Sequence, residues 1–156
     1  MKSIICVLTL IVCFMGVAEA QRSNLSDEAR KAIQEYPLTM PRANQLISAL
    51  EEMTKYVVSL PDYAERVKKS MQMTAAEQAA QLEKDPKSAA ILKKNQLTAK
   101  EYIVGVPALR MALLVAGGAP QSANIVASPA NVTFAKANYS VLKPKMDAAD
   151  GAGSRR

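Results

Sequence analysis

Apolar residues recur along most of the chain at steps of three and four, the period of an α-helix with one buried face. The clearest stretch runs from about residue 41 to 60, where the apolar positions are Ala43, Leu46, Ile47, Leu50, Met53, Val57 and Leu60. Further helices are expected over about 25–36, 74–84, 85–95, 98–117 and 128–143, and Pro61 either begins another helix or kinks the one before it. No strand-like alternation of useful length appears. The pattern therefore predicts an all-α fold, a compact bundle of six or seven helices.

The segment 97–120 is expected to be the centre of this bundle. Thr98 and Glu101 form a capping box, and Leu97 and Tyr102 have the spacing of a hydrophobic staple, so the start of the helix is well marked. Beyond it the segment is apolar on all sides, which predicts burial on all sides rather than a membrane span, because one arginine, one proline and a glycine pair interrupt it. Pro107 should kink this helix or make it start again near Val106.

The two ends of the chain differ from the helical middle. Lys2, the apolar run 4–17 and Ala18-Glu19-Ala20 fit a signal peptide, residues 1–20, that is cleaved after Ala20. We expect a single helical domain over 21–145, a disordered C-terminal tail over 146–156, and no transmembrane segment after cleavage. Pro144 should end the last helix. Export implies a periplasmic or secreted protein.

Composition removes several classes of chemistry. Both cysteines, Cys6 and Cys13, lie in the expected leader, and the chain has no histidine, which excludes thiol nucleophiles, serine–histidine pairs, ordinary zinc sites and covalently attached haem from the mature protein. We expect no cofactor and no catalytic or metal-binding residue. An enzyme built from carboxylates or lysines remains the alternative, although adjacent acids such as Glu51 and Glu52 diverge on a helix.

The net charge of +6 comes with few aromatic residues, so nucleic acid is not an expected partner. The positive charge either faces anionic lipid headgroups or envelope polymers, or simply solvates a small domain. Three N-x-S/T triplets begin at Asn24, Asn131 and Asn138. They would be glycan acceptors in a eukaryotic secretory pathway, or they occur by chance.

Arg110 is the most informative polar residue because it lies within the expected buried helix. A buried guanidinium needs a partner or must reach solvent. One interpretation is a structural ion pair with an acid from a neighbouring helix. The other is an anion anchor, together with Tyr102, at the mouth of an apolar pocket that would take a ligand such as a fatty acid.

The blocks PLTMPRANQL, NQLTAKEYIVGVPAL and SPANVTFAKANY resemble those of small secreted all-helical proteins of Gram-negative bacteria, a group without an assigned activity. The resemblance implies export and an all-helical fold, and it brings no site residue. Leu97-Thr98 is also similar to the start of an L-T-x-x-Q signature of periplasmic stress chaperones, but Glu101 stands at the glutamine position.

These observations favour a non-enzymatic binding or envelope-associated protein. Its partner would be a small apolar ligand held in the interior, or a protein bound on an exposed apolar face. A chaperone-like protein and a carboxylate- or lysine-based enzyme are the alternatives.

Overall fold

The computed structural model describes residues 26–122 and 125–153, and within them the chain is all-helical. The described residues form eight α-helices and one short 3-10 helix, with no β-strand. The helices are α2 (Asp27–Glu35), α3 (Met40–Val58), α4 (Tyr63–Ser70), α5 (Ala75–Lys84), α6 (Pro86–Lys94), α7 (Ala99–Ala116), α8 (Pro129–Ala137) and α9 (Tyr139–Asp150), and the 3-10 helix is Gly151–Gly153. The all-α class and the compact bundle are confirmed, whereas the expected number of six or seven helices is wrong. The expected leader, residues 1–20, lies outside the described residues.

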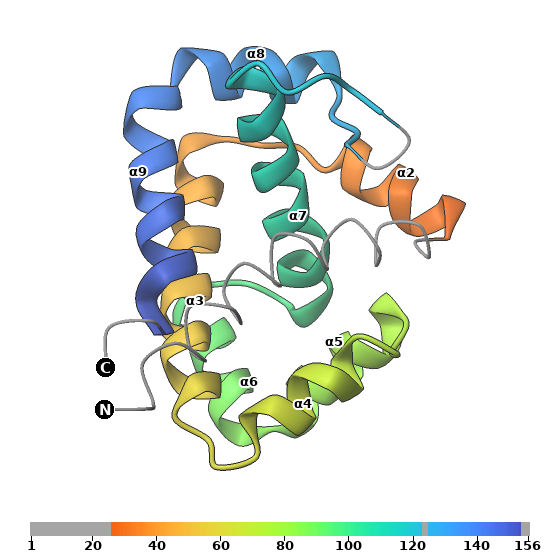
Figure 1. The fold of residues 1–156 in the computed structure, drawn as a ribbon, viewed down its shortest axis with the longest axis vertical. Coiled ribbons are helices and arrows are strands. Elements are labelled where there is room, and N and C mark those ends of the chain that lie inside the picture. Colours follow the sequence, from red (N-terminus) through yellow and green to blue (C-terminus); the bar gives the residue numbers. More distant parts are fainter. Residues whose placement is uncertain (1–25, 123–124, 154–156) are drawn as a thin grey trace, which may run out of the picture.

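Helix α7 stands at the centre of the bundle (Figure 1). It packs against α2, α3, α5, α6, α8 and α9. From residue 101 to residue 116 no side chain is exposed, and Leu109 and Ala112 are fully buried. None of the described helices has the length and apolar composition that a bilayer crossing requires.

Two prolines lie inside helices that nevertheless continue past them. Pro107 is in the middle of α7, which runs as one helix from Ala99 to Ala116, so a fresh start near Val106 is wrong and a bend of the axis stays a prediction. The Cβ of an alanine at Gly105 would lie 2.8 Å from a methyl carbon of Leu46, so glycine permits this close approach of α7 to α3.

The expected end of the last helix at Pro144, and the expected disordered tail from residue 146, are wrong for the described residues. A turn at Asn138, with φ −118° and ψ 12°, separates α8 from α9 and adds one helix to the predicted number. Helix α9 then passes through Pro144 to Asp150. Leu142, Met146 and Ala149 lie on one face of α9 and are buried against the core, which outweighs the hydrogen bond that the proline removes.

Side-chain caps fix most helix starts where the sequence placed them. Ser26, Asp85 and Ser128 cap α2, α6 and α8. Both predicted capping boxes form, at Thr74 for α5 and at Thr98 for α7. The caps define where each helix begins, and the buried apolar faces then decide how the helices pack.

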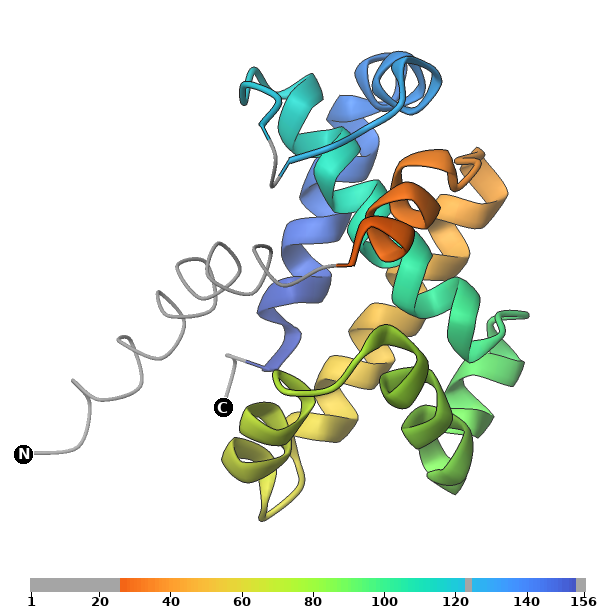
Figure 2. The ribbon, with the colours of Figure 1, turned by 90° about the vertical axis from the view of Figure 1, so that its right-hand side faces the viewer.

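Helices α3 and α9 lie side by side and run in the same direction, and α8 crosses the top of the molecule (Figures 1 and 2). Helices α4 and α5 lie at the opposite end from α8 in both views. Helix α5 packs against α6 and α7, whereas α4 makes only sparse contacts with any other element. Helix α4 is therefore the least tightly packed of the described helices.

Candidate functional site

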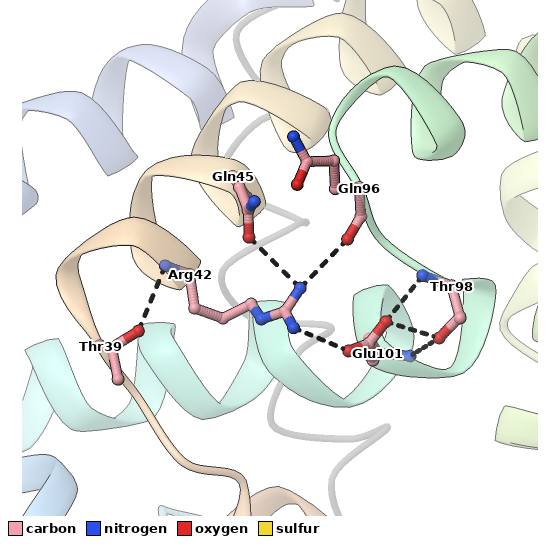
Figure 3. Close-up of polar contacts among 6 residues, drawn as sticks. All are labelled: Thr39, Arg42, Gln45, Gln96, Thr98 and Glu101. Carbon is pink, nitrogen blue, oxygen red and sulfur yellow. Dashed lines mark hydrogen bonds and ion pairs between the residues drawn. The ribbon is translucent and has the colours of Figure 1, made fainter.

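A polar cluster around Arg42 joins α3 to the start of α7 (Figure 3). The Arg42 guanidinium donates from Nη1 to Gln45 Oε1 at 3.3 Å and to the Gln96 carbonyl at 3.2 Å, and its Nη2 lies 3.1 Å from Glu101 Oε1. Gln96 has a φ of +56°, the left-handed region that non-glycine residues rarely adopt. The arginine therefore holds an unusual turn of the chain immediately before α7.

Glu101 uses its second carboxylate oxygen to close the capping box of α7. Glu101 Oε2 accepts from the Thr98 amide at 2.8 Å and from the Thr98 hydroxyl at 2.9 Å. The amide hydrogen bond holds the pKa of the Glu101 carboxyl below its usual range, against the opposing effect of burial, and Arg42 adds to the lowering. Because both oxygens are engaged within the fold, we interpret this cluster as a structural joint rather than a catalytic centre.

Tyr36 lies beside this joint and carries a hydroxyl that the fold leaves without a partner. Its hydroxyl oxygen is buried and makes no hydrogen bond with any described residue. Its ring faces Gly105, since a Cβ there would lie 2.9 Å from Tyr36 Cζ. Burial raises the pKa of the Tyr36 phenol, Arg42 lowers it and Glu101 raises it further. The isolated hydroxyl makes Tyr36 a good position for a stability test.

The structure places Arg110 in an ion pair with an acid from a neighbouring helix. Arg110 Nη2 lies 2.5 Å from Asp150 Oδ1 at the end of α9, and about a third of the Arg110 side chain is exposed (35%). Tyr102 is buried, and burial strongly raises the pKa of its phenol. This pair matches the structural interpretation of Arg110. The role of Arg110 and Tyr102 as a ligand anchor stays a prediction.

A groove of about 360 Å³ lies between α3 and α9, and neither Arg110 nor Tyr102 lines it. Its lining residues are Asn44, Ile47, Ser48, Glu51, Lys145 and Ala148. Lys145 Nζ donates to Asn44 Oδ1 at 3.0 Å, and Glu51 pairs with Lys55. The groove is open and its lining is more apolar than polar, and the predicted anchor residues are not part of it. No group of three or more acids within the described residues could hold a metal ion.

The structure describes two of the three N-x-S/T triplets, those that begin at Asn131 and Asn138. Asn131 is 4% exposed; its Nδ2 donates to the Tyr36 carbonyl at 2.8 Å and its Oδ1 accepts from the Leu38 amide at 3.3 Å. A glycan on this amide is incompatible with the fold. Asn138 donates from Nδ2 to the Phe134 carbonyl at the end of α8. Asn24 lies outside the described residues.

The segment from residue 54 to residue 87 is unusual because none of its side chains is buried. We call these residues the 54–87 lobe; they comprise the end of α3, α4, α5 and their connections. Several of its large apolar side chains are half-buried and belong to neither core cluster: Val58, Leu60, Tyr63, Val67, Met71 and Met73. The sequence signal for this lobe is a narrow apolar stripe over 63–71, in which Tyr63, Val67 and Met71 recur at steps of four.

The lobe carries only a small excess of positive charge. Residues 54–87 contain six basic and five acidic residues, an excess of one, and the described residues as a whole contain sixteen and thirteen, an excess of three. Two of the five acids, Glu77 and Asp85, are used as helix caps. Half-covered apolar side chains and lysines therefore occur together at this end of the molecule, and the net charge of the lobe is +1.

Comparisons of the chain with protein-family models, with curated proteins and with solved structures find no match, so its function must be argued from its own residues.

Proposed function

We propose that the protein is an exported, non-enzymatic binding protein of the cell envelope, and that it binds its partner through the 54–87 lobe. The observation that carries the proposal is the absence of any buried side chain across this lobe, although it holds six large, half-covered apolar residues. The leader-like residues 1–20 and the resemblance to secreted helical proteins support export.

Half-covered apolar surface favours association. Each aliphatic side chain that passes from exposed to fully buried contributes about 1.5–3 kcal/mol, so completing the burial of several half-covered chains gives a useful part of a binding free energy. Elsewhere, the most exposed large hydrophobic residue among the described residues is Val141 on α9, at 47%. Isolated exposed residues of this kind are ordinary on protein surfaces, whereas contiguous ones mark binding sites.

Cell fractionation of a Gram-negative host that exports the full chain tests the proposal. We expect the wild-type protein to sediment with the envelope, and the double variant Val67→Ser/Met71→Ser to appear in the soluble fraction. Val141→Ser is the matched control, because it removes the same kind of apolar surface outside the lobe. Recovery of the wild-type protein wholly in the soluble fraction would refute envelope binding, and equal release by the control would refute the role of the lobe.

A chaperone-like protein would use the same lobe, with an unfolded chain as its partner. It predicts that the wild-type protein slows the aggregation of a denatured client and that Val67→Ser/Met71→Ser does so less well. An enzyme would require reactive groups that converge on a free cleft. Glu51 and Lys145 do line one groove, but each is already bound to a neighbouring side chain, so the geometry favours binding over catalysis.

Small-ligand binding in the α3–α9 groove is a second candidate. The observation that favours it is Lys145, which donates to a neutral amide oxygen in a groove of ligand size. We expect native mass spectrometry of protein recovered gently from exporting cells to show a retained small anion, and Lys145→Met to lose it. A bare wild-type monomer would contradict this candidate.

A further inference from the structure

We propose that the 54–87 lobe binds an anionic lipid surface, with α4 lying along the plane of the headgroups. This inference rests on the proposed function and names the partner of the same surface. Three features of α4 support it: its apolar stripe, the exposed lysines of its last turn, and its sparse packing against the rest of the fold.

The apolar stripe has the spacing of an interfacial helix. Leu60, Tyr63, Val67 and Met71 follow one another at steps of three and four, so they share one side of α4 and of the turns that flank it. All four are half-buried, and α4 itself contributes no buried residue to the core. Since α4 packs only sparsely against other described elements and these four side chains are only partly covered, their exposed parts can enter the boundary between headgroups and acyl chains.

The charges beside the stripe suit an anionic surface. Lys68 and Lys69 lie in the last turn of α4, both are exposed, and neither forms an ion pair with a described residue. The same holds for Lys84 and Lys87 near the junction of α5 and α6. Lys68 flanks the stripe, about 100° around the helix from Val67, whereas Lys69 lies about 200° from Val67, on the opposite, polar side. Lysines beside an amphipathic helix are typical of helices that lie on anionic membranes.

A protein partner fits the same surface less well. Lysine is depleted in the buried centres of protein–protein interfaces, because its ammonium is strongly hydrated and costly to desolvate. Lipid headgroups leave the ammonium groups in a wet, negatively charged layer while the apolar side chains enter deeper. The pairing of exposed lysines with a narrow apolar stripe therefore favours lipid over protein.

Co-sedimentation with vesicles of the protein purified from cells that export it, with cleavage after Ala20 checked by mass spectrometry, tests the inference. One set of vesicles contains phosphatidylcholine alone, and the other contains one quarter phosphatidylglycerol. We expect binding to the anionic vesicles only, weakened by 0.5 M salt because the charges are exposed to solvent. Lys68→Gln/Lys69→Gln should reduce the partition coefficient at least about tenfold, since each lysine interacts independently with the surface potential.

Two further variants distinguish binding by the lobe from attraction by the overall positive charge of the protein. Lys136→Gln/Lys143→Gln removes two positive charges from α8 and α9 and should leave binding within about twofold of wild type. Val67→Ser should weaken binding even at low salt, because the apolar contribution is not screened. Circular dichroism melts of every variant check that the fold is kept.

Several outcomes would overturn the inference. Equal binding to both kinds of vesicle, or an equal loss in the α8–α9 control, would show that the lysines of α4 do not recognise anionic lipid. If the wild-type protein sediments with cell envelopes but not with vesicles, the partner is a protein and only the lipid inference fails. If it sediments with neither, the proposed function fails as well.

Discussion

Replacing Asn131 should destabilise the fold far more than replacing an ordinary surface asparagine. Asn131 lies on α8, and its amide bonds to the backbone on both sides of Pro37, in the connection between α2 and α3. In the variant Asn131→Ala, the Tyr36 carbonyl and the Leu38 amide lose their side-chain partner. Each lost hydrogen bond costs about 1 kcal/mol, and a donor or acceptor left unsatisfied in a buried place costs about 1–3 kcal/mol.

We therefore expect Asn131→Ala to lower the free energy of unfolding by about 2–4 kcal/mol. Urea denaturation followed by circular dichroism at 222 nm measures this value, since most of the described residues are helical. Asn131→Asp keeps the acceptor for the Leu38 amide but turns the donor into a second oxygen facing the Tyr36 carbonyl. It should therefore also lose at least about 1 kcal/mol.

Asn44→Ala is the matched control. Asn44 is exposed on α3, where alanine is the better helix former, so its free energy of unfolding should stay within about 0.5 kcal/mol of wild type. A loss below about 1 kcal/mol for Asn131→Ala would show that these two hydrogen bonds do not hold the α2–α3 connection, and the reasoning would be refuted.

Three further predictions follow from single side chains. Tyr36→Phe removes the buried hydroxyl that has no partner, so thermal and urea unfolding should show a free energy of unfolding raised by about 1 kcal/mol; a decrease would reveal a bond that the fold does not display. Arg110→Met should change the same free energy of unfolding by less than about 1 kcal/mol, because the ion pair with Asp150 is partly exposed. If the variant instead loses a bound ligand and keeps its stability, the result would support Arg110 as a ligand anchor. The pKa of Glu101 is lowered in the folded state, so its contribution is fully present above the unfolded pKa, about 4.3, and is lost as the pH falls through the folded pKa. Glu101→Gln keeps the capping box but cannot titrate, and a urea series between pH 6 and 2.5 should show a shallower acid loss for it than for wild type; identical slopes would contradict the assignment.

Local sequence signals predicted the helix starts well because a cap acts within one turn. The capping box at Thr98 and Glu101 needs only four consecutive residues, and it forms as expected. The burial of α7 could also be predicted from the sequence, since a helix that is apolar on every side has no polar face to expose to water.

The end of the chain was harder to predict because long-range packing decides it. Pro144 is a strong local signal for a helix end, but the burial of Leu142, Met146 and Ala149 carries α9 past it. The partner of Arg110 was missed for the same reason, since Asp150 lies in the stretch expected to be disordered. Asn131 looked like a glycan acceptor because its triplet is local, whereas its backbone partners Tyr36 and Leu38 are distant in the chain.

The candidate binding surface could be predicted only in outline. The sequence shows a narrow apolar stripe over 63–71, but a stripe alone does not reveal whether a neighbouring helix covers it. Which face of α4 stays uncovered depends on how α5 packs against α6 and α7, and this packing arises only in the assembled fold.

The central position of α7 also governs the order in which the chain can fold. Helix α3 has its main partners in α7 and α9, and α2 packs on α7, so the first half of the domain has little to pack against until the second half has been synthesised. Helices that lack partners are only marginally stable in water. The nascent chain should therefore stay largely unfolded until α9 emerges from the ribosome. For a chain exported as we propose, this delay keeps the polypeptide unfolded during translocation. The chain can then pass through a narrow translocation channel in an extended form and fold when its last helix reaches the far side.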